Sequence, residues 1–300
     1  MLKMKSIKSP LFDRDTLLHL RLPFSFFLLP VFIFGVSQAG SINVFNTIII
    51  FIILHLFIYP GSNVYNSYMD KDKGSIGGLK NPPLVTIKLY YASLICDVAG
   101  LLLCFLINWQ MMLMMLVYIG VSKAYSWKKI RLKKYGVAGW LVVMLFQGGY
   151  TFFMVNMASE NIFNPSWLTS KNLQCMVLSS LLIGGFYPLT QIYQHLEDSE
   201  RGDKTISFLL GIMGTFVFTA VLFLIATSIA YCYFEVYYGL SQFLVFILAL
   251  LPVTIYFLFW FNKTWNDEKY ADYTHTMRMT FLSSVCMIIC FSILLFLNHS

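Results

Sequence analysis

Two polar stretches of the sequence carry amides and carboxylates in the same order. Residues 59–74 read YPGSNVYNSYMDKDKG and residues 187–202 read YPLTQIYQHLEDSERG. On a helix with 3.6 residues per turn, the matching polar positions of each stretch fall within an arc of ~60°. Each arc forms a polar stripe: Tyr59, Asn63, Asn66 and Asp70 in the first stretch, and Tyr187, Gln191, Gln194 and Asp198 in the second.

These stripes suit a hard divalent cation. Mg²⁺ prefers oxygen ligands, usually one or two carboxylates together with waters and substrate phosphate. The alternative is that the stripes are ordinary solvated helix ends, but such ends need no duplication together with an upstream Tyr-Pro. The two stretches therefore predict one shared Mg²⁺ site, with catalytic candidates Asn66, Asp70, Gln194 and Asp198 and with Asp72 and Glu197 as further candidate ligands.

A third stretch is strongly basic. Residues 125–136 read YSWKKIRLKKYG. One interpretation is a patch that sets topology or binds anionic lipids. The other is a cationic clamp for a diphosphate that also lies on Mg²⁺. The clamp candidates are Lys129, Arg131 and Lys133 in this stretch and Lys73, Lys80 and Arg201 near the two acidic ones.

The elements that carry these stretches are membrane helices. The chain has 300 residues, of which 58% are hydrophobic and only 12% charged, about half the charged share of a soluble domain. Apolar runs of about 20 residues recur along it, and each is long enough to cross a bilayer. We predict an all-α, polytopic membrane protein with nine transmembrane helices, at roughly 22–39, 43–66, 84–107, 109–126, 136–157, 172–194, 206–232, 240–261 and 277–297. We expect the first run to be retained rather than cleaved as a signal peptide, because eight more follow it.

The spacing of the two polar stretches predicts an internal repeat. It maps the second helix onto the sixth, so that helices one to four correspond to helices five to eight. The predicted organisation is a single transmembrane domain over residues 1–300, with repeat units at about 22–126 and 136–261 and a ninth helix at about 277–297. Each unit has an even number of helices, so both units have the same orientation in the membrane, unlike inverted repeats.

The distribution of charge predicts the orientation. With nine spans, all Lys and Arg residues except Lys171 lie on the side of the N-terminus. The positive-inside rule makes that side cytoplasmic, so the N-terminus and all three motif loops are expected there. The net charge of +7 is explained by this topology and by attraction to membrane lipids, and we predict no nucleic-acid partner.

Several polar residues lie inside or at the ends of the predicted spans and are candidates to line a substrate cavity. They are Asn63, Gln191, Tyr65, Tyr193 and Asp97. The tyrosines also suit a membrane interface. Asp97 lies in mid-span, where a charge is costly. It is expected either to make a polar contact between helices or to orient an acceptor.

The three motifs together resemble the UbiA superfamily of intramembrane prenyltransferases. The resemblance covers most of the chain and rests on NSYMDKDKGSIGGLKNPP after the second helix, YSWKKIRLK after the fourth and QHLEDSERGDKT after the sixth. It implies two Asp-rich motifs that hold Mg²⁺ and a prenyl diphosphate, and a cavity open to the bilayer for the lipid tail. It also implies ionisation of the diphosphate to an allylic carbocation, which an aromatic or lipid acceptor captures. The positions that match the family pattern are Asn66, Asp70, Asp198, Gly202 and Thr205, and Tyr125, Lys129, Arg131 and Lys133 in the basic loop. The resemblance thereby makes Tyr125 a further candidate to bind the diphosphate.

The motifs depart from the family pattern in the same way. The first usually reads N-D-x-x-D-x-x-x-D, but Ser67 follows the Asn and Gly74 stands at the last Asp, where Asp72 is the nearest substitute. The second usually reads D-x-x-x-D, but begins with Gln194. The leading hypothesis is Mg²⁺-dependent prenyl transfer. The alternatives are a membrane terpene cyclase, which needs no acceptor, and a transporter or lipid-binding protein without turnover.

Overall fold

The structure is a computed structural model that describes residues 10–71 and 74–300. In that part of the chain it is a bundle of nine helical segments, which confirms the predicted all-α fold, and it also has one two-residue strand. The first four segments are α1 (Arg14–Leu20) with η1 (Leu22–Leu28) and α2 (Leu29–Ser37), α3 (Val44–Ile52) with η2 (Ile53–Ile58) and α4 (Tyr59–Asp70), α5 (Ile87–Cys104), and α6 (Trp109–Ser126). After η3 (Leu132–Lys134) come α7 (Gly136–Val143) with η4 (Met144–Tyr150) and α8 (Thr151–Glu160), then η5 (Pro165–Trp167), and α9 (Ser170–Phe186) with η6 (Tyr187–Gln194) and α10 (His195–Arg201). The rest is β1 (Lys204–Thr205), α11 (Ile206–Tyr237), α12 (Leu240–Asn266), η7 (Glu268–Tyr270) and α13 (Tyr273–His299).

Eight of these segments, in the described residues, are long and apolar enough to cross a membrane. The exception is α6, which the sequence predicts as the fourth span. It lies beside α4 and α5 in the bundle. Three of its polar residues, Ser122, Lys123 and Ser126, bond to polar partners on α4 and α5 rather than facing lipid. Polar side chains of a membrane helix are expected to turn inward in this way.

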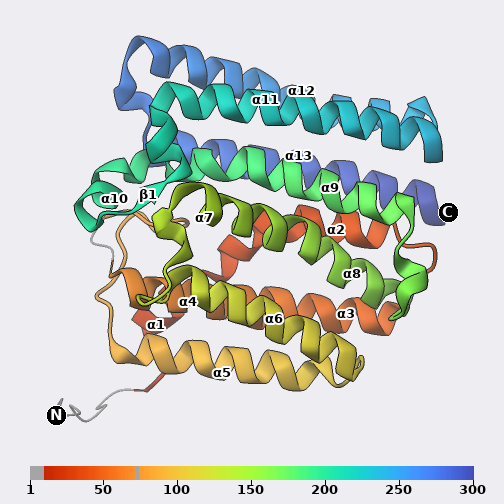
Figure 1. The fold of residues 1–300 in the computed structure, drawn as a ribbon, viewed down its shortest axis with the longest axis horizontal. Coiled ribbons are helices and arrows are strands. Elements are labelled where there is room, and N and C mark those ends of the chain that lie inside the picture. The colour runs from red at the N-terminus through yellow and green to blue at the C-terminus, as the bar shows by residue number, and fades with distance from the viewer. Residues whose placement is uncertain (1–9, 72–73) are drawn as a thin grey trace.

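The loops that carry the three motifs gather at one end of the bundle. Figure 1 shows α1, α10 and β1 at that end, and the C-terminus at the opposite one. The charge distribution predicts that the three motif loops share one side of the membrane, and nine spans place the C-terminus on the other side. Which end faces the cytoplasm stays a prediction, as does the division into two repeat units.

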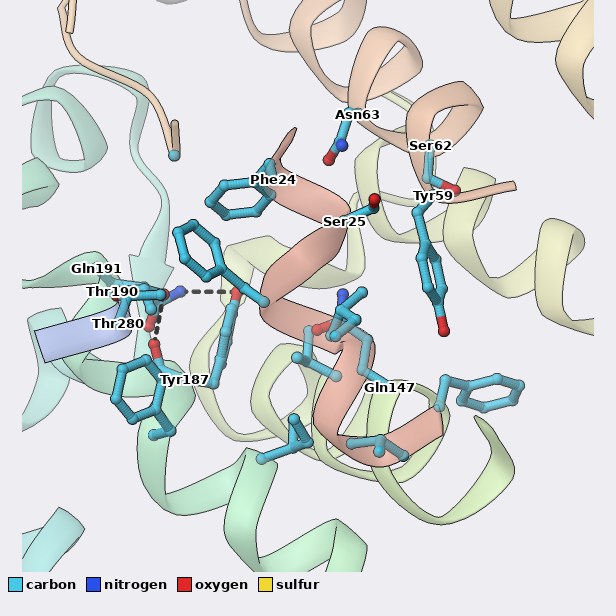
Figure 2. Close-up of a pocket in the computed structure, with 18 of the residues that line it drawn as sticks. Phe24, Ser25, Tyr59, Ser62, Asn63, Gln147, Tyr187, Thr190, Gln191 and Thr280 are labelled. Carbon is cyan, nitrogen blue, oxygen red and sulfur yellow. Dashed lines mark hydrogen bonds between the residues drawn. The ribbon is translucent and has the colours of Figure 1, made fainter. Parts of the chain in front are cut away.

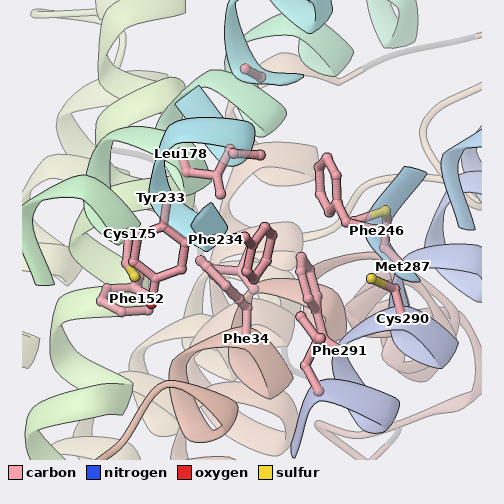
Figure 3. Packing of buried hydrophobic residues seen from close by; sticks show 14 of the residues in the cluster. Phe34, Phe152, Cys175, Leu178, Tyr233, Phe234, Phe246, Met287, Cys290 and Phe291 are labelled. Atoms are coloured by element: carbon pink, nitrogen blue, oxygen red, sulfur yellow. The ribbon is translucent and has the colours of Figure 1, made fainter. Parts of the chain in front are cut away.

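A dense aromatic core lies toward the other end. Phe34 of α2, Phe152 of α8 and Phe291 of α13 are buried, and the Phe34 ring centroid lies 4.6 Å from that of Phe291. Figure 3 shows this cluster, which also includes Tyr233 and Phe246 from α11 and α12. Buried aromatic rings exclude much apolar surface from the surroundings and pack in fixed geometries. The core therefore holds α2 and α13 in place, and both helices also line the cavity described next.

Candidate active site

A cavity of about 350 Å³ runs from the motif end into the bundle. Its charged lining residues come from the motif end of the bundle: Arg21, Asp70, Lys133, Asp198 and Arg201. Its interior is mainly aromatic and aliphatic, with Phe27, Phe34, Tyr59, Phe146, Phe186 and Phe291 among the lining side chains. Figure 2 shows part of this wall, with Tyr187, Thr190 and Gln191 on one side and Tyr59 and Ser62 on the other. The cavity thus has a charged mouth and an apolar interior.

The two Tyr-Pro pairs explain where the regular helices change. Pro60 stands in the first turn of α4, directly after the π-helix η2, and Pro188 opens the 3₁₀-helix η6. Proline lacks an N–H and removes one helical hydrogen bond, which favours such a local change of pitch. Although η6 is not an α-helix, all four residues of the second stripe line the cavity, as do all four of the first.

The first motif places Asp70 at the last residue of α4. Lys71 then adopts a left-handed conformation, with φ of 55°, and ends the helix. The Asp70 side chain is only 3% exposed, and one carboxylate oxygen lies 2.5 Å from Lys133 Nζ. Its other oxygen, Oδ1, accepts no hydrogen bond from the described residues, and a guanidinium nitrogen of Arg131 lies 3.6 Å from it. Four residues earlier, the side-chain amide oxygen of Asn66 (Oδ1) accepts a hydrogen bond of 2.7 Å from the Ser126 hydroxyl of α6.

The second motif places Asp198 in α10, opposite the first. Its carboxylate accepts hydrogen bonds from Thr205 at 3.2 Å and from Arg201 at 3.1 Å. Gly202, at φ of 70°, ends α10 in the left-handed region that favours glycine. Gln194 donates to the carbonyl of Ser75 at 3.2 Å, which connects η6 to the loop after α4. The two stripes are therefore linked at the mouth of one cavity.

The basic loop is joined to the second motif by backbone and side chains. Tyr135 pairs with Lys204, and Gly136 pairs with Thr205, in parallel bridges. Arg131 donates two hydrogen bonds of 2.7 Å to the two oxygens of Asp203, which is buried. Burial alone would raise the pKa of Asp203, but the hydrogen bonds from Arg131 and the nearby Lys133 and Arg201 hold that pKa below its ordinary value. This bidentate pair fixes the loop so that Lys133 reaches Asp70.

Two clamp candidates do not reach the cavity. Lys80 is exposed, and the short turn before it, in which Ile76 pairs with Leu79, leaves its side chain in solvent. Lys129 is also exposed, and its Nζ lies 5.7 Å from the ring centroid of Trp127. Neither lines the cavity among the residues described, and their role in binding diphosphate stays a prediction. Asp72 and Lys73 lie outside the described residues.

Four other predicted residues divide between the cavity and its surroundings. Tyr125 and Tyr193 line the cavity. Arg131 and Glu197 do not line the cavity but contact residues that do. Arg131 lies 3.6 Å from Asp70, and Glu197 lies 3.9 Å from the Arg201 guanidinium. Arg131 thus acts on the cavity through Asp203 and Asp70 rather than by direct exposure to it.

Tyr65 and Asp97 were cavity candidates and lie elsewhere. Asp97 of α5 forms an ion pair of 2.7 Å with Lys123 of α6. The Lys123 ammonium also lies 4.1 Å from the centroid of the Tyr65 ring. Neither Tyr65 nor Asp97 lines the cavity in the described part of the chain. Of the two expectations for Asp97, the polar contact between helices is the one that the structure shows.

Arg21 is a cavity residue that sequence reasoning missed. It is 7% exposed, lines the cavity, and donates hydrogen bonds of 3.0 Å to the carbonyls of Gly77 and Asn63. From the sequence alone, Arg21 contributes only to the charge distribution that predicts the orientation in the membrane. The available signal was its place at the start of an apolar span, since an arginine there must find polar partners.

The oxygen donors fit a Mg²⁺ ion that shares its ligands with a substrate. Asp70 and Asp198 both line the cavity, and Asp70 Oδ1 is buried and receives no hydrogen bond from the residues that the structure describes. No group of three or more His, Cys, Asp or Glu residues gathers at metal-binding range in the described residues. Mg²⁺ usually takes one or two carboxylates and completes its octahedron with water and phosphate oxygens. Two carboxylates with the nearby amides Asn66 and Gln194 match that pattern.

Comparison with solved structures supports the fold. An archaeal UbiA homologue from Archaeoglobus fulgidus, bound to DMAPP and Mg²⁺, matches with a TM-score of 0.70 and 18% identity over 94% of this chain and 99% of that one. The same homologue bound to GPP and Mg²⁺ matches with a TM-score of 0.68 and 18% identity over the same shares. A digeranylgeranylglyceryl phosphate synthase matches with a TM-score of 0.58 and 14% identity over 93% of this chain and 98% of that one. No curated protein matches the chain.

The family assignment comes from the sequence as a whole. The model of the UbiA prenyltransferase family matches residues 27–285, which is most of the chain and includes all three motifs. The charged mouth and apolar interior of the cavity lie within that range, apart from Arg21, Phe24 and Ser25 before it and Met287 and Phe291 after it. The chain belongs to the UbiA prenyltransferase family.

Proposed function

We propose that the protein transfers a prenyl group from a prenyl diphosphate to an aromatic or lipid acceptor within the membrane, with Mg²⁺ as cofactor. The observation that carries this proposal is the single cavity in which Asp70 and Asp198 meet Lys133 and Arg201 at the mouth of an aromatic interior. The Archaeoglobus fulgidus homologue, of the same fold, is bound to DMAPP or GPP with Mg²⁺ in its structures, which supports the same substrate class here.

The cationic and the acidic residues at the mouth of the cavity have different roles. Lys133, Arg201 and Arg21 bring positive charge to the mouth, where they stabilise the negative charge that grows on a departing diphosphate. The residues that would hold Mg²⁺ are Asp70 and Asp198, with oxygens of Asn66 and Gln194. When bound, the ion supplies further electrostatic stabilisation of the leaving group.

The interior protects the carbocation. Tyr59, Phe146, Phe186 and the other rings of the wall keep water away from the allylic cation. Their faces also attract positive charge, each by on the order of 0.5–2 kcal/mol. The acceptor then supplies an electron pair to the allylic carbon to form the new bond, and the proton that the acceptor loses passes to the released diphosphate.

A terpene cyclase is the second candidate, and the aromatic wall is the observation that favours it. In a cyclase the double bonds of the substrate itself capture the cation, so that a shielded cavity suffices. The deciding experiment incubates the purified protein with farnesyl or geranylgeranyl diphosphate and Mg²⁺ without any acceptor.

Transfer predicts that the diphosphate is consumed only when an aromatic acid or quinone precursor is added. A cyclic hydrocarbon or alcohol formed without acceptor would establish the cyclase instead. Binding of the diphosphate with no turnover under either condition would contradict both enzymes and favour a transporter or lipid-binding role.

A further inference from the structure

Three side chains of the cavity form a continuous line of hydrogen bonds. Gln191 Nε2 donates to the Tyr187 hydroxyl at 2.9 Å, and the Tyr187 hydroxyl is hydrogen-bonded to that of Tyr125. All three line the cavity. Figure 2 shows the first of these bonds, between Gln191 and Tyr187 on one wall. These hydrogen bonds connect two helices, because Gln191 and Tyr187 belong to η6 and Tyr125 belongs to α6.

The amide at one end gives the line a direction. A tyrosine hydroxyl has one proton to donate and accepts through its oxygen. Because Gln191 donates to Tyr187, the Tyr187 proton is available for the Tyr125 oxygen. The Tyr125 proton is then left to point into the cavity. Each hydroxyl that accepts a hydrogen bond also becomes a stronger donor, so the line polarises Tyr125.

We propose that Gln191 and Tyr187 are positioning residues that direct the Tyr125 hydroxyl as a hydrogen-bond donor to the leaving diphosphate. This inference rests on the proposed function. In the step, the bond between the allylic carbon and the diphosphate oxygen breaks, and its electron pair goes to that oxygen. The Tyr125 proton stays on Tyr125 and hydrogen-bonds the oxygen as its charge grows, which is where a prearranged donor lowers a barrier most.

The test reverses the direction of the line without changing its shape. In Gln191→Glu the ionised carboxylate can only accept, so the Tyr187 hydroxyl donates its hydrogen bond to it, and the Tyr125 hydroxyl must then donate to the Tyr187 oxygen. The substrate is farnesyl diphosphate labelled with oxygen-18 at the bridging position, with Mg²⁺. Ionisation is measured as the sum of label exchange into the non-bridging positions and diphosphate release. This sum reports bond cleavage whether or not an acceptor is present.

We expect the ionisation rate of Gln191→Glu at pH 8 to fall by about 10- to 100-fold, somewhat less than the loss of a direct oxyanion donor. The KM should stay close to that of the wild type, because the diphosphate is held mainly by Lys133, Arg201 and Arg21. Tyr187→Phe should show a similar loss. The double variant should be no slower than Tyr187→Phe alone, because Gln191 acts only through Tyr187.

The pH profile separates this role from a structural one. A protonated carboxyl group donates again, so the rate of Gln191→Glu relative to wild type at the same pH should recover as the pH falls. The matched control is Gln242→Glu. Gln191 and Gln242 are both 7% exposed, and the side-chain oxygen Oε1 of each accepts no hydrogen bond from the described residues. Gln242 Nε2 donates to Asn298, but Gln242 does not line the cavity. This variant should ionise the substrate at the wild-type rate at every pH.

The outcomes distinguish the inference from the function it rests on. A wild-type protein that leaves the labelled diphosphate intact contradicts the proposed function itself. If the wild type ionises it and Gln191→Glu does so at the same rate, only the inference fails. Additive losses in the double variant, or a Gln191→Glu defect that does not change with pH, would likewise assign Gln191 to the fold rather than to Tyr125.

Discussion

Asp70 and Lys133, which are far apart in the sequence, lie 2.5 Å apart at the mouth of the cavity. Lys133 also lies 4.0 Å from Asp203, and Arg131 connects the same two acids. The acids of both motifs are thus paired with the cations expected to hold the diphosphate. A diphosphate with its metal brings both signs of charge, so it offers new partners to both sets of side chains at once.

The first prediction concerns the two motif carboxylates. Asp70→Asn and Asp198→Asn each keep the shape of the side chain and remove its charge. We expect each to lower diphosphate turnover by on the order of 10²-fold or more, because the electrostatic stabilisation of the leaving group is lost. Turnover and its dependence on Mg²⁺ concentration are the measurements. Asp267→Asn, on an aspartate whose side chain is 45% exposed, is the control. Wild-type rates in both motif variants would show that the site is assigned wrongly.

The second prediction concerns the pair of Arg131 with Asp203. The Asp203 carboxylate has a lowered pKa in the folded protein, so the pair contributes stability above the ordinary aspartate pKa of 3.8 and loses it as the pH falls through the lower folded value. We expect the melting temperature of the wild type to fall with acidification below about pH 4 more steeply than that of Asp203→Asn. At neutral pH the variant should already be less stable, because Arg131 loses its bidentate partner. If the melting temperatures of the wild type and of Asp203→Asn changed with pH by the same amount, the pair would make no pH-dependent contribution to stability.

The third prediction concerns the intramembrane pair of Asp97 with Lys123. The side chains are 8% and 23% exposed. Removing one charge leaves the other buried without its partner, which is more damaging than removing both. We expect Asp97→Leu and Lys123→Leu each to lower the melting temperature in detergent, and the double variant to recover part of the loss. The folded fraction of the double variant should bind diphosphate as the wild type does, because neither residue lines the cavity.

Much of the fold was predictable because its signals are local. Eight of the nine helices in the described residues follow from apolar length, and the convergence of Asp70 and Asp198 follows from two polar stripes placed on the same side of the membrane. The partner of Asp97 was not predictable, since it depends on the rotation of α5 and α6 about their axes. That rotation places Lys123 inside the bundle, although its position near the end of a span suggested only a topological role.

The basic loop shows the same limit on a smaller scale. Lys129 and Lys133 lie four residues apart in one cationic run, and the sequence offers no reason to prefer either. The choice is made by Arg131, which takes a left-handed conformation at φ of 47° and starts η3. The chain turns there, so that Lys133 faces Asp70 while Lys129 remains in solvent. Such a backbone conformation at a non-glycine residue is uncommon and cannot be predicted from the residue types in the loop.

The last prediction concerns Arg21. Its guanidinium holds η1 against α4 and the loop after α4 through the carbonyls of Asn63 and Gly77, and it faces the cavity. Arg21→Gln removes the charge, and Arg21→Lys keeps it but cannot bridge two carbonyls in the same way. Both variants should be less stable than the wild type without ligand. The informative quantity is therefore the rise in melting temperature on adding farnesyl diphosphate with Mg²⁺, which reports affinity separately from baseline stability. We expect this rise to be largest in the wild type, smaller in Arg21→Lys and smallest in Arg21→Gln, with exposed Arg14→Gln equal to the wild type. If Arg21→Gln showed the full rise, Arg21 would be a structural residue of the η1 turn and not part of the diphosphate site.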